Sequence, residues 1–479
     1  MAETELLLIF PPVSTAERYS SDADDLGGHM PPLGITSIAS LLEKKGFSVK
    51  ILDAAVEGLT IKETIAAALE ENPGVFGLSC LTLTLDKCVK IAEGIKKKTP
   101  QKPIIIGGHH ASIDPSGVMK NKCFDLLTFG ESEETILEIM RGFKKEKNLL
   151  RDKKKLNGIK GIVFRSKGKI VRTRPRKPIE NLDKLPWPAR HLLPMQKYLP
   201  LANQYKRKPA TNIVAIRGCP YNCTYCSSHS MFGRKIRFRS PENVVAEIRH
   251  LTEKYGIKEI SFWDDTLTIN KQWLKRLCDL IVREKIGITW SCYGRVNTVD
   301  LELLKKMKKA GCWNIFYGLE SGNQDLLNLI KKGTTLEQIR QAIKWTKKAG
   351  IETRGSFMLA LPNETPEKAR KTIDLAIELD LDYAQFCITT PFPGTELFET
   401  ARKFGSLDNN LKKYNIWEAV FVPFGYKDRK EVEAIYNEAF RKFYFRPRYV
   451  IKRLLAIRNI EDMKRNLNGV RMLLGLGKK

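Results

Sequence analysis

Three cysteines are crowded into one short stretch of the sequence. Cys219, Cys223 and Cys226 lie in the run RGCPYNCTYC, residues 217–226, with three residues between the first two and two between the last two. Thiolates are ligands for soft metals and for iron–sulfur clusters. The other seven of the ten cysteines are dispersed, and most lie in apolar surroundings, where a thiol packs as a small hydrophobic side chain. The cluster is therefore the first candidate for a metal centre.

The number of thiols narrows the kind of metal centre. A structural zinc site takes four ligands, and no fourth cysteine or histidine completes a compact zinc spacing, since His229 is poorly placed. Three thiolates on a four-iron cubane leave one iron open, as a catalytic cluster requires. A zinc loop with a distant fourth ligand, or a chance grouping of cysteines, explains the spacing less well.

The same run resembles the hallmark of the radical S-adenosylmethionine (SAM) superfamily, C-x3-C-x-aromatic-C, with Tyr225 at the aromatic position. The resemblance implies that Cys219, Cys223 and Cys226 bind a [4Fe–4S] cluster and that Tyr225 lies near the adenine of SAM. It also implies that SAM chelates the open iron, and that the reduced cluster cleaves SAM to a 5′-deoxyadenosyl radical. No catalytic residue beyond the cluster ligands is assigned.

Three further residues follow the cysteines in the order that the superfamily shows. Asp264, in the segment SFWDDT, resembles the region that contacts the SAM amino group, and Glu320, in the segment GLESG, resembles the residue that contacts the ribose. Arg295 is expected to pair with the SAM carboxylate, because a guanidinium and a carboxylate match through two hydrogen bonds. A carboxylate at a strand end also often caps a helix or faces solvent, so the order of the three residues carries the resemblance.

Alternating strands and helices are expected to position these residues. Apolar runs separated by helical patterns predict six strands, at Asn212–Ile216, Glu259–Trp263, Ile288–Tyr293, Trp313–Gly318, Ser356–Leu361 and Ala384–Thr389. Six such units form either a partial barrel or a doubly wound sheet, and both bind ligands at the carboxyl ends of their strands. The resemblance covers about residues 205–400 and implies a partial (β/α)6 radical SAM barrel.

The first part of the chain alternates in the same way. Five short apolar runs predict a parallel sheet wrapped by helices, with strands at Leu6–Phe10, Ser48–Leu52, Val75–Ser79, Pro103–Ile106 and Leu126–Phe129. A sheet of this kind binds a flavin, a nucleotide or cobalamin. We therefore expect an α/β fold whose N-terminal domain is Rossmann-like.

Three fragments after predicted strands resemble the D-x-H-x-x-G, S-x-L and G-G motifs of cobalamin (B12)-binding domains. The resemblance implies that cobalamin is bound by the corresponding residues, which are Asp53, Gly58, Ser79, Leu81, Gly107 and Gly108. The histidine of the first motif is replaced by Ala55, which cannot ligate cobalt, so the resemblance implies base-off cobalamin without a histidine ligand. A degenerate domain that binds nothing is the alternative, and His109 and His110 are expected to be loop residues rather than replacement ligands.

These patterns divide the chain into four segments. Residues 1–145 form the cobalamin-binding domain, and residues 146–204 form a linker with a predicted β-hairpin followed by several prolines, which exclude a continuous helix. Residues 205–400 form the radical SAM domain. Residues 401–479 are expected to be a basic helical region.

Two cofactors in one chain suggest the reaction. A deoxyadenosyl radical and methylcobalamin together would methylate an unactivated carbon, whereas some relatives close a ring, contract a ring or rearrange a lipid head group without net methyl transfer. The segment FYFRPRY, residues 443–449, resembles the tail of hopanoid-modifying and bacteriochlorophyll-cyclase families, which favours an apolar or lipid substrate. A non-enzymatic B12 or iron–sulfur sensor would leave the ordered barrel motifs unexplained. An RNA-modifying methylthiotransferase does not fit the dispersed cysteines of the N-terminal domain.

The charge and the apolar content of the sequence limit the kinds of binding partner and the cellular location that are expected. The net charge is +28, which favours anionic partners or a lysine-rich surface, although no nucleic-acid partner is expected. No run approaches the roughly 20 apolar residues that span a bilayer, and the start MAETELLLIFPP is too short and acidic for a secretory signal, so we expect a cytoplasmic protein. Residues 440–479 hold 12 Lys or Arg against 2 Asp or Glu, a pattern typical of a helix that contacts a membrane surface or packs on its own domain. A reductant protein such as flavodoxin or ferredoxin is the expected electron donor.

Overall fold

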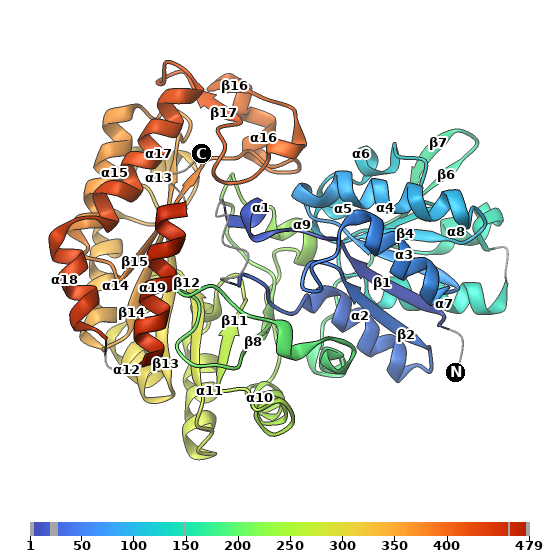
Figure 1. Cartoon of the computed structure of the whole chain (residues 1–479), viewed down its shortest axis with the longest axis horizontal. Coiled ribbons are helices and arrows are strands. Elements are labelled where there is room, and N and C mark those ends of the chain that lie inside the picture. Colours follow the sequence, from blue (N-terminus) through green and yellow to red (C-terminus); the bar gives the residue numbers. More distant parts are fainter. Residues whose placement is uncertain (1–3, 20–26, 147–148, 458–459, 476–479) are drawn as a thin grey trace. The chain divides into compact units, whose positions relative to one another are not determined.

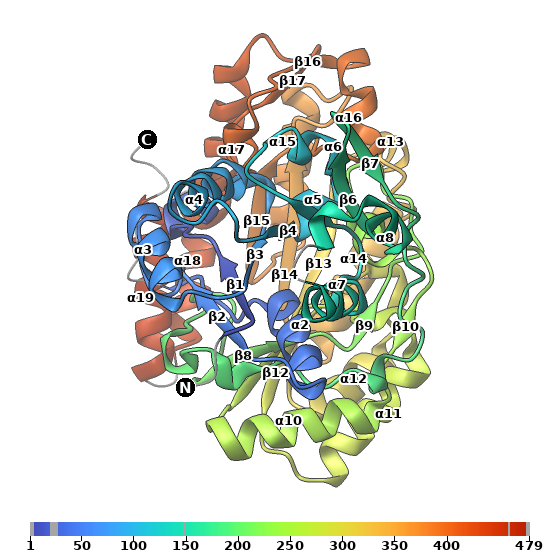
Figure 2. The same cartoon turned by 90° about the vertical axis from the view of Figure 1, so that its right-hand side faces the viewer.

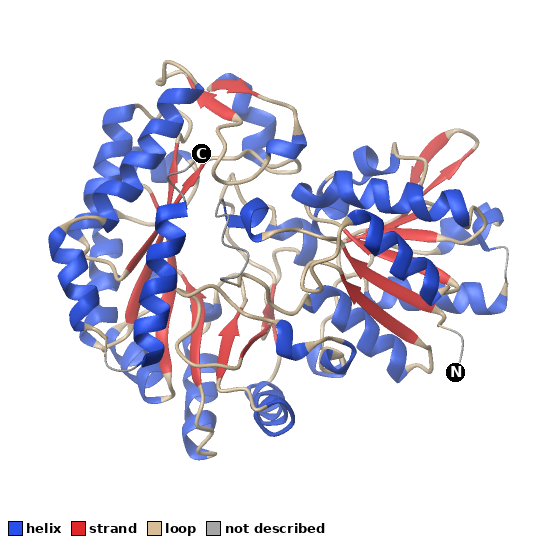
Figure 3. Cartoon of the chain, viewed as in Figure 1, coloured by secondary structure: helices blue, strands red, loops and turns tan. Residues whose placement is uncertain are grey.

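The computed structural model describes residues 4–19, 27–146, 149–457 and 460–475. Its internal contacts divide the chain into two compact units. Unit 1 consists of Met1–Ser14, Pro31–Tyr198 and Ser227–Arg237, and unit 2 consists of Thr15–Met30, Leu199–Cys226 and Phe238–Lys479. Helices and strands alternate along most of both units (Figure 3).

Unit 1 is built on one seven-stranded sheet with the order β2-β1-β3-β4-β5-β6-β7. The first five strands are parallel, and the last two are antiparallel to their neighbours. The strands are β1 (Leu6–Phe10), β2 (Val49–Asp53), β3 (Val75–Ser79), β4 (Ile104–Gly107), β5 (Leu126–Thr128), β6 (Ile162–Ser166) and β7 (Lys169–Arg172). The predicted hairpin is therefore β6–β7, and it pairs with β5 and extends the sheet instead of standing apart as a linker element.

Both faces of this sheet are covered by helices, as parallel sheets require. In β1, Leu6 and Leu8 pack into one apolar cluster with α2 and α7, whereas Leu7 and Ile9 pack into a second cluster with α4 and α6. Figure 2 shows α3 and α4 on one side of β1–β4, and α2 and α7 on the other. The helices of unit 1 are α2 (Leu33–Lys44), α3 (Ile61–Glu71), α4 (Leu85–Lys98), α5 (His109–Ile113), α6 (Pro115–Met119), α7 (Glu133–Lys145), α8 (Lys153–Gly158) and α9 (Ser228–Phe232).

Unit 2 is built on six parallel strands that follow one another in chain order, β8-β11-β12-β13-β14-β15. They are β8 (Ala210–Ile213), β11 (Glu259–Phe262), β12 (Thr289–Gly294), β13 (Cys312–Glu320), β14 (Glu352–Leu359) and β15 (Tyr383–Ile388). Since β8 and β15 are the two edges, the sheet is a partial barrel with a lateral opening between them. The predicted α/β fold, with a six-stranded partial barrel following a Rossmann-like domain, is confirmed.

Amphipathic helices cover the outside of this barrel (Figure 1). In α11, for example, Asn270 caps the first turn, and Leu274, Leu277 and Ile281 lie one or two turns apart on a buried face. The helices of unit 2 before residue 400 are α1 (Thr15–Tyr19), α10 (Pro241–Tyr255), α11 (Lys271–Arg283), α12 (Leu301–Lys309), α13 (Gln324–Leu329), α14 (Leu336–Lys348), α15 (Pro366–Glu378) and α16 (Glu396–Thr400). Two very short strands, β9 (Ile216–Arg217) and β10 (Arg237–Phe238), lie in the segment between β8 and α10.

The last part of the chain is mainly helical, as expected, but it also contains a pair of antiparallel strands. Its elements are β16 (Gly405–Leu407), β17 (Phe421–Pro423), α17 (Arg429–Tyr444), α18 (Pro447–Leu455) and α19 (Ile460–Gly475). Strands of three residues are too short to leave a periodic signal in the sequence. None of the helices in the described ranges is both long and apolar enough to cross a membrane.

Candidate functional site

The three clustered cysteines lie on a loop directly after β9. Gly218 precedes the first of them with a φ of +95°, a conformation that glycine adopts without strain. Two backbone hydrogen bonds anchor the loop inside unit 2: Thr224 N donates to Ile330 O at 3.0 Å, and Leu397 N donates to Thr224 O at 2.8 Å. None of the three cysteines forms a disulfide, and all three are half-buried, so the loop presents a set of soft donors in a fixed backbone frame.

Asp264 supports the strand that leads into this loop. Its side chain is buried, and Oδ1 accepts hydrogen bonds from the backbone N–H groups of Ala215 at 2.7 Å and Ile216 at 2.5 Å. Burial raises the pKa of Asp264 to about 7, because a charged carboxylate is poorly solvated there. The carboxyl group predicted to lie near the SAM amino group therefore holds backbone in this structure, and its contact with SAM stays a prediction.

Arg295 is the cation beside the cysteines. It follows β12 and is buried, with Nη1 at 3.7 Å from Cys223 Sγ and with its guanidinium at 3.7 Å from the centre of the Tyr221 ring. Its Nε donates to Asn297 Oδ1 at 3.0 Å. Burial raises the pKa of the Cys219 thiol, and the charge of Arg295 acts in the opposite direction. A fixed positive charge next to the loop favours anionic groups there, whether thiolates or a carboxylate.

Glu320 belongs to a buried ion pair that includes the aromatic residue of the cysteine motif. Its Oε1 accepts from Lys332 Nζ at 2.7 Å and from Tyr225 OH at 2.9 Å, and Lys332 Nζ lies 3.2 Å from Tyr225 OH. Glu320 has a φ of +65° where the register between β13 and β14 shifts. A Cβ at Gly318 would lie 2.4 Å from Glu320 Oε1, so only glycine leaves room for this pair.

The sequence reasoning did not single out Lys332. Its side chain is as buried as that of Glu320, at 8% exposure each, although lysine is almost never buried unless it is paired. The local pattern Lys331-Lys332-Gly333 is indistinguishable from an exposed basic turn. Only the position of Glu320 twelve residues earlier, at the end of β13, could have suggested a partner.

Two links therefore connect the cysteine loop to the carboxyl ends of the third and fourth barrel strands, through Arg295 and through Glu320. Within the described residues, no three Asp, Glu, His or Cys side chains converge on a single metal ion. Three thiols on one loop instead suit a polynuclear cluster, in which each thiolate binds a different iron. The donor type, the partial burial and the adjacent cation all fit a [4Fe–4S] cluster held by Cys219, Cys223 and Cys226.

In unit 1, two candidate loops meet at the carboxyl ends of β3 and β4. Cys80 N donates to Gly107 O at 2.8 Å, and His110 N donates to Cys80 O at 3.0 Å. Gly108 has a φ of +98°, and a Cβ there would lie 2.8 Å from Cys80 N. Ser79 is half-buried, and the neighbouring Leu81 side chain is 36% exposed. Close-packed glycine backbone beside an accessible apolar side chain suits a large flat ligand.

The third candidate loop follows β2. The buried carboxylate of Asp53 shapes it, because Oδ1 accepts from Ala55 N at 3.2 Å and from Val56 N at 3.3 Å, while Oδ2 accepts from Tyr198 OH at 2.7 Å. Gly58 has a φ of +70° and open space around its Cα. In a sheet with the order 2-1-3-4-5, ligands bind at the carboxyl ends near the switch between β1 and β3, and these loops follow the strands on both sides of it.

Ala55, which stands at the histidine position of the first motif, packs against the apolar core. His110 is fully buried with Nδ1 at 3.0 Å from Thr82 Oγ1, and burial lowers its pKa to about 4. His109 Nε2 lies 3.1 Å from Ser227 Oγ. Glycine backbone and apolar loops fit a corrin, whereas the loop after β2 offers it no imidazole.

Two family models match the chain. The model of the radical SAM superfamily matches residues 213–376, and that of the B12 binding domain matches residues 21–140. The two matches fall on the segments in which the sequence motifs of the cysteine loop and of the glycine-containing loops occur.

Curated relatives match almost the whole chain. An uncharacterized methyltransferase from Pyrococcus horikoshii is 34% identical over 94% of this chain and 95% of its own length. The anaerobic magnesium-protoporphyrin IX monomethyl ester cyclase of Rubrivivax gelatinosus is 28% identical over 89% of this chain and 76% of its own length. Among solved structures, the radical SAM methyltransferase TsrM from Kitasatospora setae, with cobalamin and a [4Fe–4S] cluster bound, covers 99% of each chain with a TM-score of 0.72 at 16% identity. That likeness shows a shared fold.

Proposed function

We propose that this chain, which belongs to the cobalamin-binding radical SAM enzymes, transfers a methyl group to an unactivated carbon of an apolar substrate. The family predicted from the sequence motifs is confirmed by both family matches and by the relative that is 34% identical over 94% of the chain. The chain is therefore a radical SAM enzyme and not a non-enzymatic sensor. The observation that carries the proposal is the set of contacts around the cysteine loop. Arg295 lies beside Cys223. Glu320 accepts hydrogen bonds from Tyr225 and from Lys332.

The cofactors bring the reactive groups, and the protein positions them. When bound, the cluster with SAM supplies a 5′-deoxyadenosyl radical, and cobalamin supplies a transferable methyl group. Cys219, Cys223 and Cys226 would hold the cluster. Arg295 would bind the SAM carboxylate, since its guanidinium already lies beside the thiols.

Glu320 and Lys332 orient the polar end of Tyr225. Both bond to its hydroxyl group, at 2.9 Å and 3.2 Å, and thereby hold the ring in a single position. We propose that this ring and the Glu320 carboxylate form the surface against which the adenosine part of SAM lies. A preformed polar surface of this kind loses little conformational entropy on binding.

We also propose that cobalamin is bound base-off, without a histidine below the cobalt. Asp53, Gly58, Ser79, Leu81, Gly107 and Gly108 would form its site. Ala55 supports the proposal because it carries no nitrogen ligand. Purified holoprotein should show the spectrum of a base-off corrin, and a histidine-ligated spectrum would contradict this part of the proposal.

An apolar substrate is supported by a cavity of about 580 Å³ within unit 2, lined mainly by aromatic and aliphatic side chains of the barrel and of α17–α19. The exposed aliphatic side chains of α18, with Ile451 at 56%, Leu454 at 61% and Leu455 at 79% exposure, support a lipid source for the substrate and a peripheral contact of the basic tail with an anionic membrane. We propose a flavodoxin or ferredoxin as reductant, and a cytoplasmic site of action.

The methyl-transfer proposal is tested with methyl-labelled SAM. The anaerobically reconstituted enzyme, a chemical reductant and a lipid extract of the source cells should yield labelled product together with 5′-deoxyadenosine and S-adenosylhomocysteine. Relatedness to the cyclase at 28% identity supports a second candidate, ring closure or rearrangement, which consumes substrate without transfer of label. Turnover of substrate without label in the product would therefore contradict methylation and favour ring closure or rearrangement.

A further inference from the structure

The cavity of unit 2 lies at the lateral opening of the barrel. It is lined from one edge strand by residues of β15 such as Tyr383 and Gln385, and from the other side by residues 201–204, which precede β8. Two arginines of the C-terminal helices bridge these two sides. Arg453 Nη2 on α18 donates to Tyr383 OH at 2.7 Å, and Arg465 Nη1 on α19 donates to Tyr205 O at 3.3 Å. Helices α18 and α19 therefore cover the opening that six strands leave.

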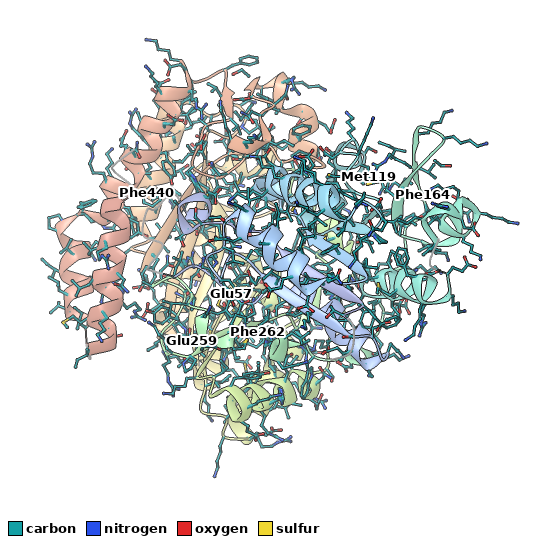
Figure 4. All side chains as sticks on the ribbon, turned by 45° about the vertical axis from the view of Figure 1, so that its right-hand side comes forward. Glu57, Met119, Phe164, Glu259, Phe262 and Phe440 are labelled. Atoms are coloured by element: carbon teal, nitrogen blue, oxygen red, sulfur yellow. The ribbon has the colours of Figure 1, made fainter. Side chains whose placement is uncertain are left out.

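Aromatic side chains form a large part of the cavity wall, on the barrel side and on the helix side. On the barrel side, Tyr293 and Phe316 lie with ring centres 5.3 Å apart. On the helix side, Phe440 of α17 contacts Tyr436 at 5.0 Å and Phe386 of β15 at 5.5 Å, and Figure 4 shows Phe440 on this helix. Aromatic walls bury flat or branched apolar groups well.

One buried cation in this wall has no anion among the described residues. Arg354 lies on β14 with 7% of its surface exposed, and its guanidinium is 4.1 Å from the centre of the Phe316 ring. Its Nη2 donates to Gln385 Oε1 at 2.8 Å, whereas its Nε is buried without a hydrogen-bond partner. Across the described residues, no carboxylate lies within ion-pair distance of this guanidinium. A buried charge of this kind is costly unless an anion compensates it.

The other arginines of the cavity wall differ from Arg354 in this respect. Arg453 has Glu352 at 4.0 Å, and Arg465 has Asp462 at 3.3 Å. Among the arginines that line the cavity in the described ranges, Arg354 is therefore the one whose charge remains available to a ligand, and its fork of N–H donors matches a carboxylate or a phosphate.

We infer that this cavity binds a substrate with an apolar, aromatic-sized body and one oxyanion group, and that Arg354 binds the oxyanion. This inference rests on the proposed function and specifies the substrate class of the same enzyme. Phe316, which pairs with Arg354, precedes Glu320 by four residues on β13, which corresponds to roughly 13 Å at about 3.3 Å per residue. A substrate held by its anion at Arg354 would therefore extend along the barrel interior toward the SAM-binding residues.

The test uses the full-length reconstituted enzyme and two probes of equal shape, 1-pyrenebutyrate and the neutral 1-pyrenebutanol, in anaerobic equilibrium dialysis. We expect the carboxylate to bind at least tenfold more tightly, which corresponds to about 1.4 kcal/mol. Arg354→Gln should abolish this preference and leave the affinity for the alcohol unchanged. Arg340→Gln, which removes an exposed arginine paired with Glu378 on the outside of the same unit, is the matched control and should change neither affinity.

A second variant avoids any dependence on the folding of Arg354→Gln. Gly469 lines the cavity from α19, and an added Cβ there meets nothing within 4 Å, so Gly469→Trp should fold and fill the space. It should weaken both probes by at least tenfold. Equal affinity of the two probes for the parent enzyme, an unchanged preference in Arg354→Gln, or unchanged binding in Gly469→Trp would each overturn the inference. Binding of these probes needs no methyl transfer, so failure of the labelled-SAM experiment would leave this result standing.

Discussion

The buried pair of Lys332 and Glu320 offers a sharp test of how the SAM-binding surface is held together. Lys332→Met removes the ion pair and leaves the Glu320 carboxylate buried. The hydrogen bond that this carboxylate accepts from Tyr225 OH remains. Removing one member of a buried ion pair costs about 3–5 kcal/mol, because the other charge stays desolvated. We therefore expect unit 2 of Lys332→Met to lose stability on that scale and the affinity for SAM to fall.

The neighbouring lysine provides the matched control. Lys331 pairs with Glu396, but its side chain is 53% exposed, and exposed pairs contribute about 0–1 kcal/mol. Unfolding in urea can be followed by tryptophan fluorescence, because six of the seven tryptophans belong to unit 2 and only Trp187 belongs to unit 1. Lys332→Met should unfold at clearly lower urea concentration than Lys331→Met.

A double variant separates charge burial from packing. If the loss in Lys332→Met comes from an unpaired carboxylate, then adding Glu320→Gln should recover part of it, with a coupling of about 1–3 kcal/mol between the two sites. Equal stability of Lys332→Met and Lys331→Met would refute the reasoning. So would a double variant whose loss is the sum of the two single losses.

Three further predictions concern residues that shape the loops. Burial raises the pKa of Glu364 from 4.5 to about 8, so the folded state retains a proton that the unfolded chain releases. The free energy of unfolding should therefore fall by up to about 1.4 kcal/mol per pH unit as the pH rises from roughly 4.5 to 8. Glu364→Gln should flatten this dependence in thermal melts at several pH values. Gly108→Ala should destabilise unit 1 by about 1–3 kcal/mol and reduce the amount of cobalamin retained on purification, because the φ of Gly108 is +98° and the new Cβ would meet Cys80 N at 2.8 Å. A variant that retains as much cobalamin as the parent protein would count against the cobalamin site. Asp264→Ala should lower the iron content after anaerobic reconstitution, since it removes the acceptor of the N–H groups before the cysteine loop, and full iron content would contradict that positioning role.

Much of the scaffold follows from local apolar patterning. The strands at Leu6–Phe10 and Val75–Ser79 occur with the predicted bounds, because each is a clear apolar run. β14 begins at Glu352, four residues before the predicted start at Ser356. Its first residues include the buried Arg354, and a polar residue that faces a cavity is locally indistinguishable from a loop residue.

The features that sequence reasoning missed depend on tertiary pairing. The strand β6 pairs antiparallel with β5. The local sequences of these two strands do not show at which edge of the sheet β6 is added. Lys332 becomes part of the site only because the chain after α13 returns to the end of β13. Asp264 is predicted from a resemblance to the region that contacts the SAM amino group, and its bonds to the backbone N–H groups of Ala215 and Ile216 could not be predicted from that resemblance.

The most direct test of the central claim is a product count from one reaction. The reconstituted enzyme, methyl-labelled SAM, reductant and substrate should yield 5′-deoxyadenosine and S-adenosylhomocysteine in equal amounts with label in the product, and the triple variant Cys219→Ala/Cys223→Ala/Cys226→Ala should yield neither 5′-deoxyadenosine nor labelled product. Substrate consumption with 5′-deoxyadenosine but without S-adenosylhomocysteine would contradict methyl transfer. Formation of 5′-deoxyadenosine by the triple cysteine variant would contradict the assignment of the cluster site itself.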